Sequence, residues 1–267
     1  MPKPDTITSA ANPLLKDVRR AISRGALTEQ GWCVAETFHL LEEALCSECE
    51  VKMVLASESA LPATETQVRR RPVKISVLPD ALFNSIAGTE TSQGVIALVK
   101  PPEWKLEQFF GAATLLVVLD GLQDPGNAGT IVRAAEAFGT TGILFLKGTV
   151  SPYNPKTLRA SAGSLFRVPF VHGVDAVLAR TTLRHNQVEL FAGVPAGFRK
   201  LARPLAAVDL TGRCGLIIGS EAHGVSGELR AAAIDVTIPT VGVESLNAAV
   251  AAGILLYEAR RQRMLRA

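Results

Sequence analysis

The chain has 267 residues, of which 48% are hydrophobic, and a formal net charge of +3 at pH 7. This composition excludes a disordered chain, and the length suits one large domain or two ordinary ones. Because no apolar run approaches the roughly 18 residues of a membrane span and the first residues lack the apolar core of a signal peptide, we expect a cytoplasmic protein with no membrane partner.

The first 100 residues predict a small α/β domain. Asn12 to Ser23 places four aliphatic side chains on one face, which is typical of an amphipathic helix. Phe38 to Leu45 predicts a second helix. Three apolar runs predict strands, at Val51 to Ala56, Val73 to Leu78 and Gln93 to Val99.

Basic residues cluster at three places, and each cluster is either a solvated face or a phosphate contact. The first contains Lys16, Arg19 and Arg20, on the first predicted helix. The others are Arg69 to Arg71 and the arginines between Arg260 and Arg266. A net charge of +3 is too small to decide between the two interpretations.

Two of the four cysteines, Cys46 and Cys49, have the C-x-x-C spacing of metal or redox sites. A structural zinc site needs a second pair of ligands, and Cys33 and Cys214 do not form one in the sequence. We therefore expect ordinary reduced cysteines and no metal site.

Paired prolines at Pro101 and Pro102 disfavour both helix and central strand, which indicates a linker. We therefore place a first domain at residues 1–100, the linker at 101–111 and a second domain at 112–267. The second domain holds three places where an apolar strand runs into a loop that carries polar residues.

The first of these junctions lies between Leu115 and Gly139. Its apolar start predicts a buried parallel strand, and the following glycines predict a loop as far as Gly129. Thr130 to Phe138 predicts a helix, with Arg133 in about its first turn. The helix dipole opposes a cation at that end, so we infer that Arg133 interacts with something outside the helix.

The second junction, Leu216 to Ser226, ends in a loop that holds Glu221 and His223. The third starts with a strand at Val236 to Ile238, passes a turn at Pro239 and Gly242, and enters a helix. Ser245, Leu246 and Asn247 lie at or near the start of that helix. Since ligands bind at the carboxyl ends of parallel strands, we expect one site to collect these polar residues.

One alternative is a nucleotide-binding Rossmann protein, since Leu115 to Gly139 reads as strand, glycine loop and helix. Its loop, G-L-Q-D-P-G-N-A-G, does not match G-x-G-x-x-G, and no G-K-[ST] follows it. The sequence therefore argues against this alternative.

The three junctions resemble the three motifs of the SpoU (TrmH-type) RNA ribose methyltransferases of the SPOUT superfamily, in order and in spacing. The first match comprises Asn127, Gly129 and Arg133, and the second Gly219, Glu221 and Gly224. The third comprises Ile238, Pro239, Ser245, Leu246 and Asn247. The segment Ser151 to Phe166 resembles a further family stretch, so the likeness covers residues 112–267.

This resemblance implies an α/β fold with a parallel sheet and a deep trefoil knot, which the usual rules of chain connection would not predict. It implies that S-adenosyl-L-methionine binds in the knot, and that the protein is a homodimer through this domain, with each site near the subunit interface. The implied reaction is methylation of a ribose 2′-hydroxyl in ribosomal or transfer RNA.

The first 100 residues are similar to the α/β substrate-binding domain that precedes many SpoU catalytic domains. The similarity rests on Ile7 to Pro13, the region of Glu36, and Thr91 to Val95. The family usually has Glu-Gly after the first strand, whereas Glu36 is followed by Thr37 here, and threonine does not easily take a positive φ.

The resemblance also suggests roles for residues. We expect Arg133 to orient a substrate phosphate and stabilise the developing alkoxide, because arginine rarely gives up its proton. Asn127 would bind the ribose or position Arg133, and Glu221 would accept hydrogen bonds from loop amides or pair with a cation. Ser245 and Asn247 would cap the last helix and contact the substrate or Arg133.

The family pattern implies that the cofactor binds to main-chain groups, at Gly219, Gly224, Ile238, Pro239 and Leu246. His223 is more simply explained as a solvated loop residue than as a base. For RNA contact we name Arg159, with the dimer partner as its alternative, together with Lys16, Arg19 and Arg20.

The predicted function is therefore 2′-O-methylation of RNA with S-adenosyl-L-methionine. The extra N-terminal domain favours ribosomal RNA over transfer RNA. The alternatives are a transfer RNA 2′-O-methyltransferase and a non-catalytic RNA-binding or assembly protein with the same fold.

Overall fold

The computed structural model describes residues 4–89, 91–195 and 201–266. The chain forms two compact units. Unit 1 comprises Met1–Glu103 and Tyr153–Arg167, and unit 2 comprises Trp104–Pro152 and Val168–Ala267. These two units are defined by contacts in space, whereas the domain limits that we expect at residues 100 and 111 rest on composition and motifs. Those limits stay a prediction. None of the helices in the described ranges combines the length and apolar character that crossing a membrane requires.

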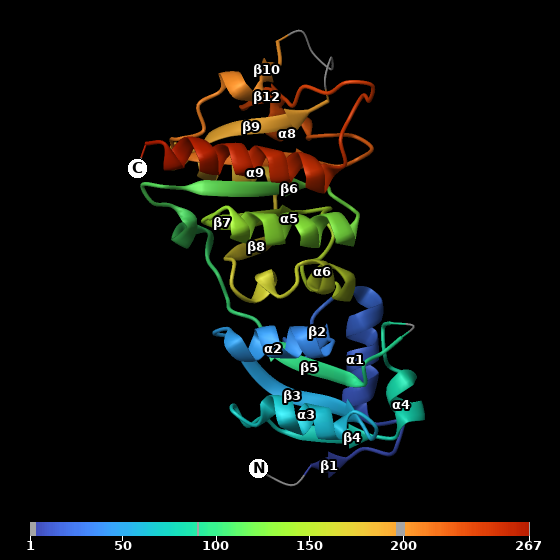
Figure 1. The fold of residues 1–267 in the computed structure, drawn as a ribbon. Helices are drawn as coiled ribbons and strands as arrows, with labels where there is room; N and C mark the ends of the chain where they lie inside the picture. Colours follow the sequence, from blue (N-terminus) through green and yellow to red (C-terminus); the bar gives the residue numbers. More distant parts are fainter. Residues whose placement is uncertain (1–3, 90, 196–200, 267) are drawn as a thin grey trace. The chain divides into compact units, whose positions relative to one another are not determined.

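Unit 1 is built on a mixed sheet with the strand order β1-β4-β3-β5-β2 (Figure 1). The described strands are β1 (Asp5–Thr6), β2 (Cys33–Glu36), β3 (Glu50–Ser57), β4 (Ile75–Leu78) and β5 (Val95–Lys100). Its helices are α1 (Pro13–Arg24), α2 (Phe38–Cys46), α3 (Leu61–Val68), α4 (Asp80–Asn84) and α6 (Pro155–Ala160), with a 3₁₀ turn, η2 (Ser164–Phe166). Both predicted helices and all three predicted strands of this region are confirmed.

The segment Tyr153–Arg167, which contains α6 and η2, belongs to unit 1 although it follows β7 in the chain. An ion pair joins Arg159 Nη1 to Glu36 Oε2 at 3.5 Å, and a second joins Arg167 to Glu43. The thiol of Cys49 donates to the carbonyl of Phe166 at 3.5 Å. Arg159 thus has a structural partner within its own unit.

The position after Glu36 has the backbone that glycine would favour, because Thr37 has φ 134° and ψ 153°. The Thr37 side chain caps α2 by accepting a hydrogen bond from Leu40 N at 3.1 Å. Such a backbone costs about 1–3 kcal/mol in a residue with a Cβ, whereas a glycine cap is only slightly weaker than threonine.

We expect Thr37→Gly to raise the free energy of unfolding by about 1 kcal/mol, since the strain removed exceeds the cap lost. Thr37→Ala, which loses the cap and keeps the strain, should lower it by about 1 kcal/mol. Urea denaturation of the full chain measures both. Equal destabilisation by the two variants would show that Thr37 is not strained.

Unit 2 contains a seven-stranded, wholly parallel sheet in the described residues, with the order β10-β12-β9-β11-β6-β7-β8. The strands are β6 (Leu115–Asp120), β7 (Gly142–Leu146), β8 (Phe170–Val174), β9 (Glu189–Val194), β10 (Arg203–Pro204), β11 (Cys214–Gly219) and β12 (Ala233–Thr237). This confirms the predicted α/β class and its parallel sheet. All carboxyl ends meet at one edge.

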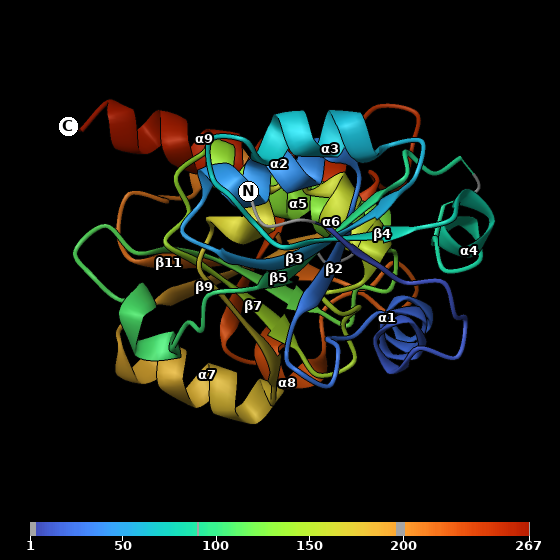
Figure 2. The ribbon, with the colours of Figure 1, turned by 90° about the horizontal axis from the view of Figure 1, so that it is seen from below.

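Helices cover both faces of this sheet. α5 (Pro125–Ala137) and α9 (Ala248–Met264) pack together on one face, and α7 (Ala176–His185) and α8 (Gly227–Arg230) lie on the other (Figure 2). Two 3₁₀ turns, η1 (Leu106–Phe109) and η3 (Leu205–Ala207), complete the elements described in unit 2. The apolar core beneath α7 and α8 includes Leu116, Leu144, Leu183, Ile217 and Leu229.

The helix after β6 corrects two expectations. It begins at Pro125 and not at Thr130, because Asp124 is its N-cap and accepts a hydrogen bond from Asn127 N at 2.6 Å. Gly129 is therefore a buried helical residue and not part of a loop. Arg133 lies eight residues after Pro125, in the third turn, so the argument from the helix dipole is wrong.

The C-terminal arginines are largely bound within unit 2. The guanidinium of Arg263 donates to four main-chain carbonyls just before β6 and β11, at 2.5–3.0 Å, those of Ala113, Thr114, Leu210 and Gly212. Arg261 pairs with Glu258, and Arg266 pairs with Asp209. For these three arginines the structure favours internal pairing over phosphate contact.

Candidate cofactor and active site

A cavity of about 510 Å³ opens at the carboxyl edge of the unit 2 sheet. Such a volume is ordinary for a site that binds a small molecule or cofactor. Its walls come from the end of β9, the loop after β11, the segment between β12 and α9, and the first turns of α9. Four of the predicted cofactor-binding residues line it, namely Gly219, Gly224, Ile238 and Leu246, whereas Pro239 does not.

The loop after β11 folds back tightly on the strand end. Ser220 and Gly224 exchange two main-chain hydrogen bonds, at 2.9 and 3.1 Å, and Gly224 takes φ +67°. A Cβ built on Gly219 would lie 2.1 Å from the carbonyl carbon of Gly224. Glycine at position 219 therefore allows two backbones to approach each other at the wall of the cavity.

Polar side chains from all three junctions meet beside this loop. Asn127 Nδ2 donates to Glu221 Oε1 at 2.8 Å, and Asn247 Nδ2 donates to Asn127 Oδ1 at 3.0 Å. Asn247 is also the N-cap of α9, because its Oδ1 accepts from Ala249 N and Val250 N. Residues 120 positions apart in the chain thus form one hydrogen-bonded cluster.

Ser245 and Arg133 are placed differently. Ser245 is exposed and lines the cavity beside Asn247. Arg133 is exposed on α5, does not line the cavity, and makes no hydrogen bond or ion pair with any residue that the structure describes. At about 100° per residue, its direction from α5 differs by roughly 120° from that of Asn127.

The structure adds residues to the site that sequence reasoning missed. Gly193 to Pro195, at the end of β9, line the cavity, as does Arg230, which pairs with Asp235 at 3.4 Å. No motif marks β9, and its place beside β11 and β12 depends on a strand order that the sequence does not state. His223 also lines the cavity, and its main-chain N–H donates to Ser220 Oγ.

The residues named for RNA contact all lie in unit 1. Lys16 and Arg19 are exposed on α1, where Arg19 donates to Ser85 Oγ at 3.3 Å. Arg20 bridges Asp17 and Glu29, at 2.7 and 2.6 Å. Of the four named residues, Lys16 and Arg19 are therefore free of carboxylate partners, whereas Arg20 and Arg159 have them.

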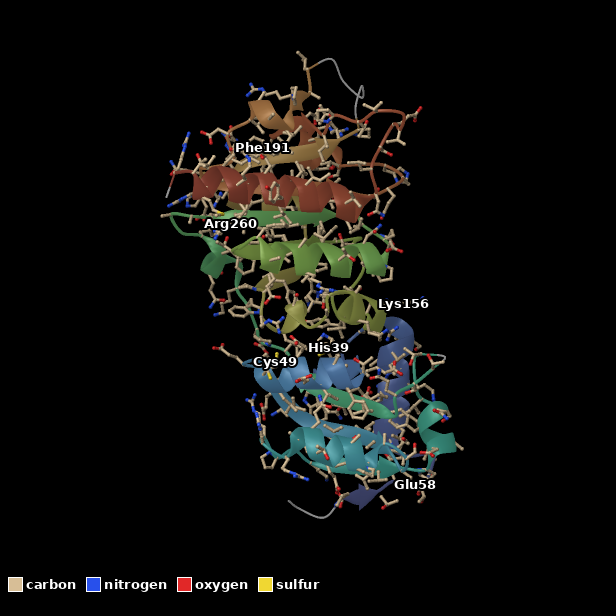
Figure 3. All side chains as sticks on the ribbon, viewed as in Figure 1. His39, Cys49, Glu58, Lys156, Phe191 and Arg260 are labelled. Carbon is tan, nitrogen blue, oxygen red and sulfur yellow. The ribbon has the colours of Figure 1, made fainter. Side chains whose placement is uncertain are left out.

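The cysteines are free thiols. Burial raises the pKa of both Cys33 and Cys49, which makes these thiols poor nucleophiles (Cys49 is labelled in Figure 3). Cys46 is exposed. In residues 4–89, 91–195 and 201–266, no three His, Cys, Asp or Glu side chains group closely enough to hold a metal ion.

The chain thus belongs to the class of two-unit α/β proteins, with a cavity at the strand ends of the wholly parallel sheet described in unit 2. Residues 114–257 match the SpoU rRNA Methylase family, and residues 12–97 match the MRM3-like substrate binding domain. The chain belongs to the SpoU rRNA methylase family. The resemblance read from the three motifs is thereby confirmed.

Individual relatives agree with this result. The chain is 32% identical to the 23S rRNA (guanosine(2553)-2′-O)-methyltransferase RlmP of Bacillus subtilis over 95% of this chain and 98% of that protein. It is 33% identical to the 23S rRNA (guanosine-2′-O-)-methyltransferase RlmB of Xylella fastidiosa over 81% of this chain and 90% of that one.

A similar solved structure is the SpoU methyltransferase AviRb of Streptomyces viridochromogenes in complex with AdoMet, at 26% identity and a TM-score of 0.84. It aligns over 95% of this chain and 98% of that one. The predictions of a methyltransferase, of its fold class and of S-adenosyl-L-methionine as cofactor are confirmed at the level of the family.

Proposed function

We propose that this chain transfers a methyl group from S-adenosyl-L-methionine to a ribose 2′-hydroxyl in ribosomal RNA. The observation that carries the proposal is the cluster of Asn127, Glu221 and Asn247 at the cavity. The named ribosomal RNA methyltransferases among the relatives and the substrate-binding domain support the choice of RNA. The bacterial relatives support the cytoplasm, which the sequence also led us to expect, as the place of this activity.

The cavity fits the cofactor in size and in chemistry. Its wall at Gly219 and Gly224 consists of main chain in close contact, which leaves peptide groups to face a ligand. Glu221 and Glu244 line the cavity and provide negative charge for a cationic ligand. We also propose that the chain forms a trefoil knot around this cavity, because membership of the SpoU family implies one.

When bound, S-adenosyl-L-methionine supplies an electrophilic methyl group on a sulfonium centre. The protein must then position the ribose hydroxyl and stabilise the charge that develops on its oxygen. Asn127, held between Glu221 and Asn247, has a fixed side chain that can orient the ribose. Arg133, which has no partner among the described residues, is available to a substrate phosphate and to the developing alkoxide.

The second part of the proposal is a homodimer through unit 2. Val250, Ile254 and Tyr257 form an exposed apolar stripe on α9, with 51%, 36% and 55% of their surfaces accessible. Their spacing of four and three residues places them on one helix face. Tyr257 also packs edge-on against Phe138, the residue after α5, with ring centroids 6.0 Å apart. A second copy of this face would bury the stripe.

We expect the double variant Ile254→Glu with Tyr257→Glu to be monomeric, because two carboxylates would have to enter an apolar interface. Methyl transfer should fall at least about tenfold, since each site is proposed to lie near the interface. Light scattering after gel filtration measures the mass, and tritium transfer measures the activity. A matched control is Val177→Glu with Leu178→Glu on α7, at exposed apolar positions away from the stripe. A dimeric, active double variant at α9 would contradict the proposal.

The direct test of the proposed function is a transfer assay with purified protein, S-adenosyl-L-methionine and two RNA substrates, ribosomal RNA and transfer RNA. Methylation of ribosomal RNA alone supports the proposal. Methylation of transfer RNA alone supports the first alternative. Tight binding of ribosomal RNA without transfer supports a non-catalytic assembly role.

A further inference from the structure

A buried carboxylate lies outside the cavity, next to the loop of the second junction. This second-junction loop runs from Ser220 to Ser226. Asp120 is the last residue of β6, and only 8% of its surface is exposed. In the sheet it is the register partner of Gly219, the last residue of β11. Asp120 does not line the cavity and matches none of the motif positions quoted above. A carboxylate so buried needs hydrogen-bond donors to offset its desolvation.

The donor is a main-chain group of the loop. Ser226 N donates to Asp120 Oδ2 at 2.7 Å, a length typical of a charge-assisted hydrogen bond. Ser226 is the N-cap of α8 and ends the loop that starts after Gly219. The beginning of the loop is held by the two main-chain hydrogen bonds between Ser220 and Gly224. The loop is thus hydrogen-bonded within itself at its beginning and hydrogen-bonded to β6 at its end.

This loop presents both kinds of group on which the site depends. Its residues Ser220 to Gly224 line one wall of the cavity. Its side chain Glu221 accepts the hydrogen bond from Asn127. A change in the position of the loop would therefore move the wall and the carboxylate together.

We propose that Asp120 is a positioning residue of the cofactor site, which holds the second-junction loop in its binding conformation through Ser226 N. The proposal rests on the assignment of the cavity to S-adenosyl-L-methionine. Asp120 touches neither the cofactor nor the substrate and acts through the loop. Without its acceptor, the N–H of Ser226 is left unsatisfied, and the loop occupies other conformations for much of the time.

The size of the effect follows from the strength of the bond. A hydrogen bond to a charged group contributes about 1.5–3 kcal/mol, which corresponds to a factor of roughly 10 to 100 in an equilibrium. If the loop is competent for only a fraction of the time, the measured affinity falls by that fraction. We expect Asp120→Leu to raise the dissociation constant for S-adenosyl-L-methionine at least about tenfold.

Two further variants separate the hydrogen bond from the packing of the side chain. Asp120→Asn keeps the shape and an acceptor oxygen, so its dissociation constant should stay within about threefold of the wild type. Ser226→Pro removes the donor from the other side, and the φ of −59° at Ser226 suits the proline ring. Ser226→Pro should weaken binding as Asp120→Leu does.

A matched control uses an aspartate that also accepts a main-chain hydrogen bond in unit 2. Asp175 caps α7 by accepting from Val177 N at 3.0 Å, and it does not line the cavity. Asp175→Leu should lower the melting temperature and leave the cofactor affinity unchanged. This control distinguishes a general loss of stability from a loss of loop position.

The experiment is isothermal titration of S-adenosyl-L-methionine into the full-length wild type and the four variants, at a temperature where melting curves show each to be folded. Weak binding by Asp120→Leu and Ser226→Pro, with recovery in Asp120→Asn, supports the proposal. The proposal is overturned if Asp120→Leu and Ser226→Pro both bind with wild-type affinity. It is also overturned if Asp120→Asn and Asp120→Leu lose equal affinity for the cofactor. If Asp120→Leu does not fold, Ser226→Pro and Asp120→Asn decide by the same criteria. Failure of the wild type to bind contradicts the cofactor assignment itself.

Discussion

Replacement of Gly219 by alanine is expected to raise the dissociation constant for S-adenosyl-L-methionine by at least about a hundredfold. The added Cβ would lie 2.1 Å from the carbonyl carbon of Gly224 and 2.3 Å from Val225 N, so one of the two backbones must move. Main chain cannot yield as a flexible side chain does, because Ser220 and Gly224 are hydrogen-bonded to each other. The displaced loop would distort the cavity wall, and interior packing does not absorb such shifts.

Two other glycines serve as controls for the same substitution. Gly227, just after the loop, and Gly253, within α9, have open space where a Cβ would be placed. Gly227→Ala should keep wild-type affinity, and Gly253→Ala should in addition gain about 0.5–1 kcal/mol of stability as a helical alanine. Calorimetry with the cofactor and melting curves for all three variants make the comparison. Tight cofactor binding by Gly219→Ala would show that the cavity is not the cofactor site.

The second large effect is expected at Arg133. Arg133→Ala should lower the rate of methyl transfer by about 10²–10³-fold, the usual loss when one donor to a developing oxyanion is removed. Cofactor affinity should stay close to that of the wild type, because Arg133 is exposed and does not line the cavity. Arg133→Lys should recover only part of the rate, since an ammonium group lacks the bidentate geometry of arginine.

Single-turnover transfer to RNA measures the rate, and calorimetry with S-adenosyl-L-methionine measures the affinity. A large loss of affinity in Arg133→Ala would contradict the role in transfer and place the residue in cofactor binding. An unchanged rate would leave Arg133 as a surface arginine of α5.

Much of the site could be predicted because its chemistry lies at strand ends. The apolar runs before Asp120 and Gly219 mark buried parallel strands, whose carboxyl ends share one edge of a sheet. The polar residues at the start of α9 are also recognisable in the sequence as helix caps, and Asn247 is the N-cap. These are local signals, so a single sequence contains them.

The parts that could not be predicted depend on long-range contacts or on a misread local signal. Asp124-Pro125 is a helix start, but the nearby glycines indicated a loop. Gly129 in fact lies within the helix and is buried there. The segment Tyr153–Arg167 belongs to unit 1, where two of its arginines pair with Glu36 and Glu43. No pattern in the sequence gives the distance between such residues.

The role of Asp120 is a similar case. In sequence it is one acid at the end of a strand, indistinguishable from a solvated residue. Only the register of β6 against β11 places it beside Gly219, and only the path of the loop brings Ser226 N to it.

The most direct test of the central claim is mass-spectrometric mapping of modified nucleosides in ribosomal RNA from the source organism, with the gene, without it, and with the Asn127→Ala variant in its place. The proposed function predicts that one 2′-O-methylated nucleoside disappears from ribosomal RNA without the gene, returns with the wild-type gene, and stays absent or strongly reduced with the variant. An identical map of ribosomal RNA in all strains would contradict it.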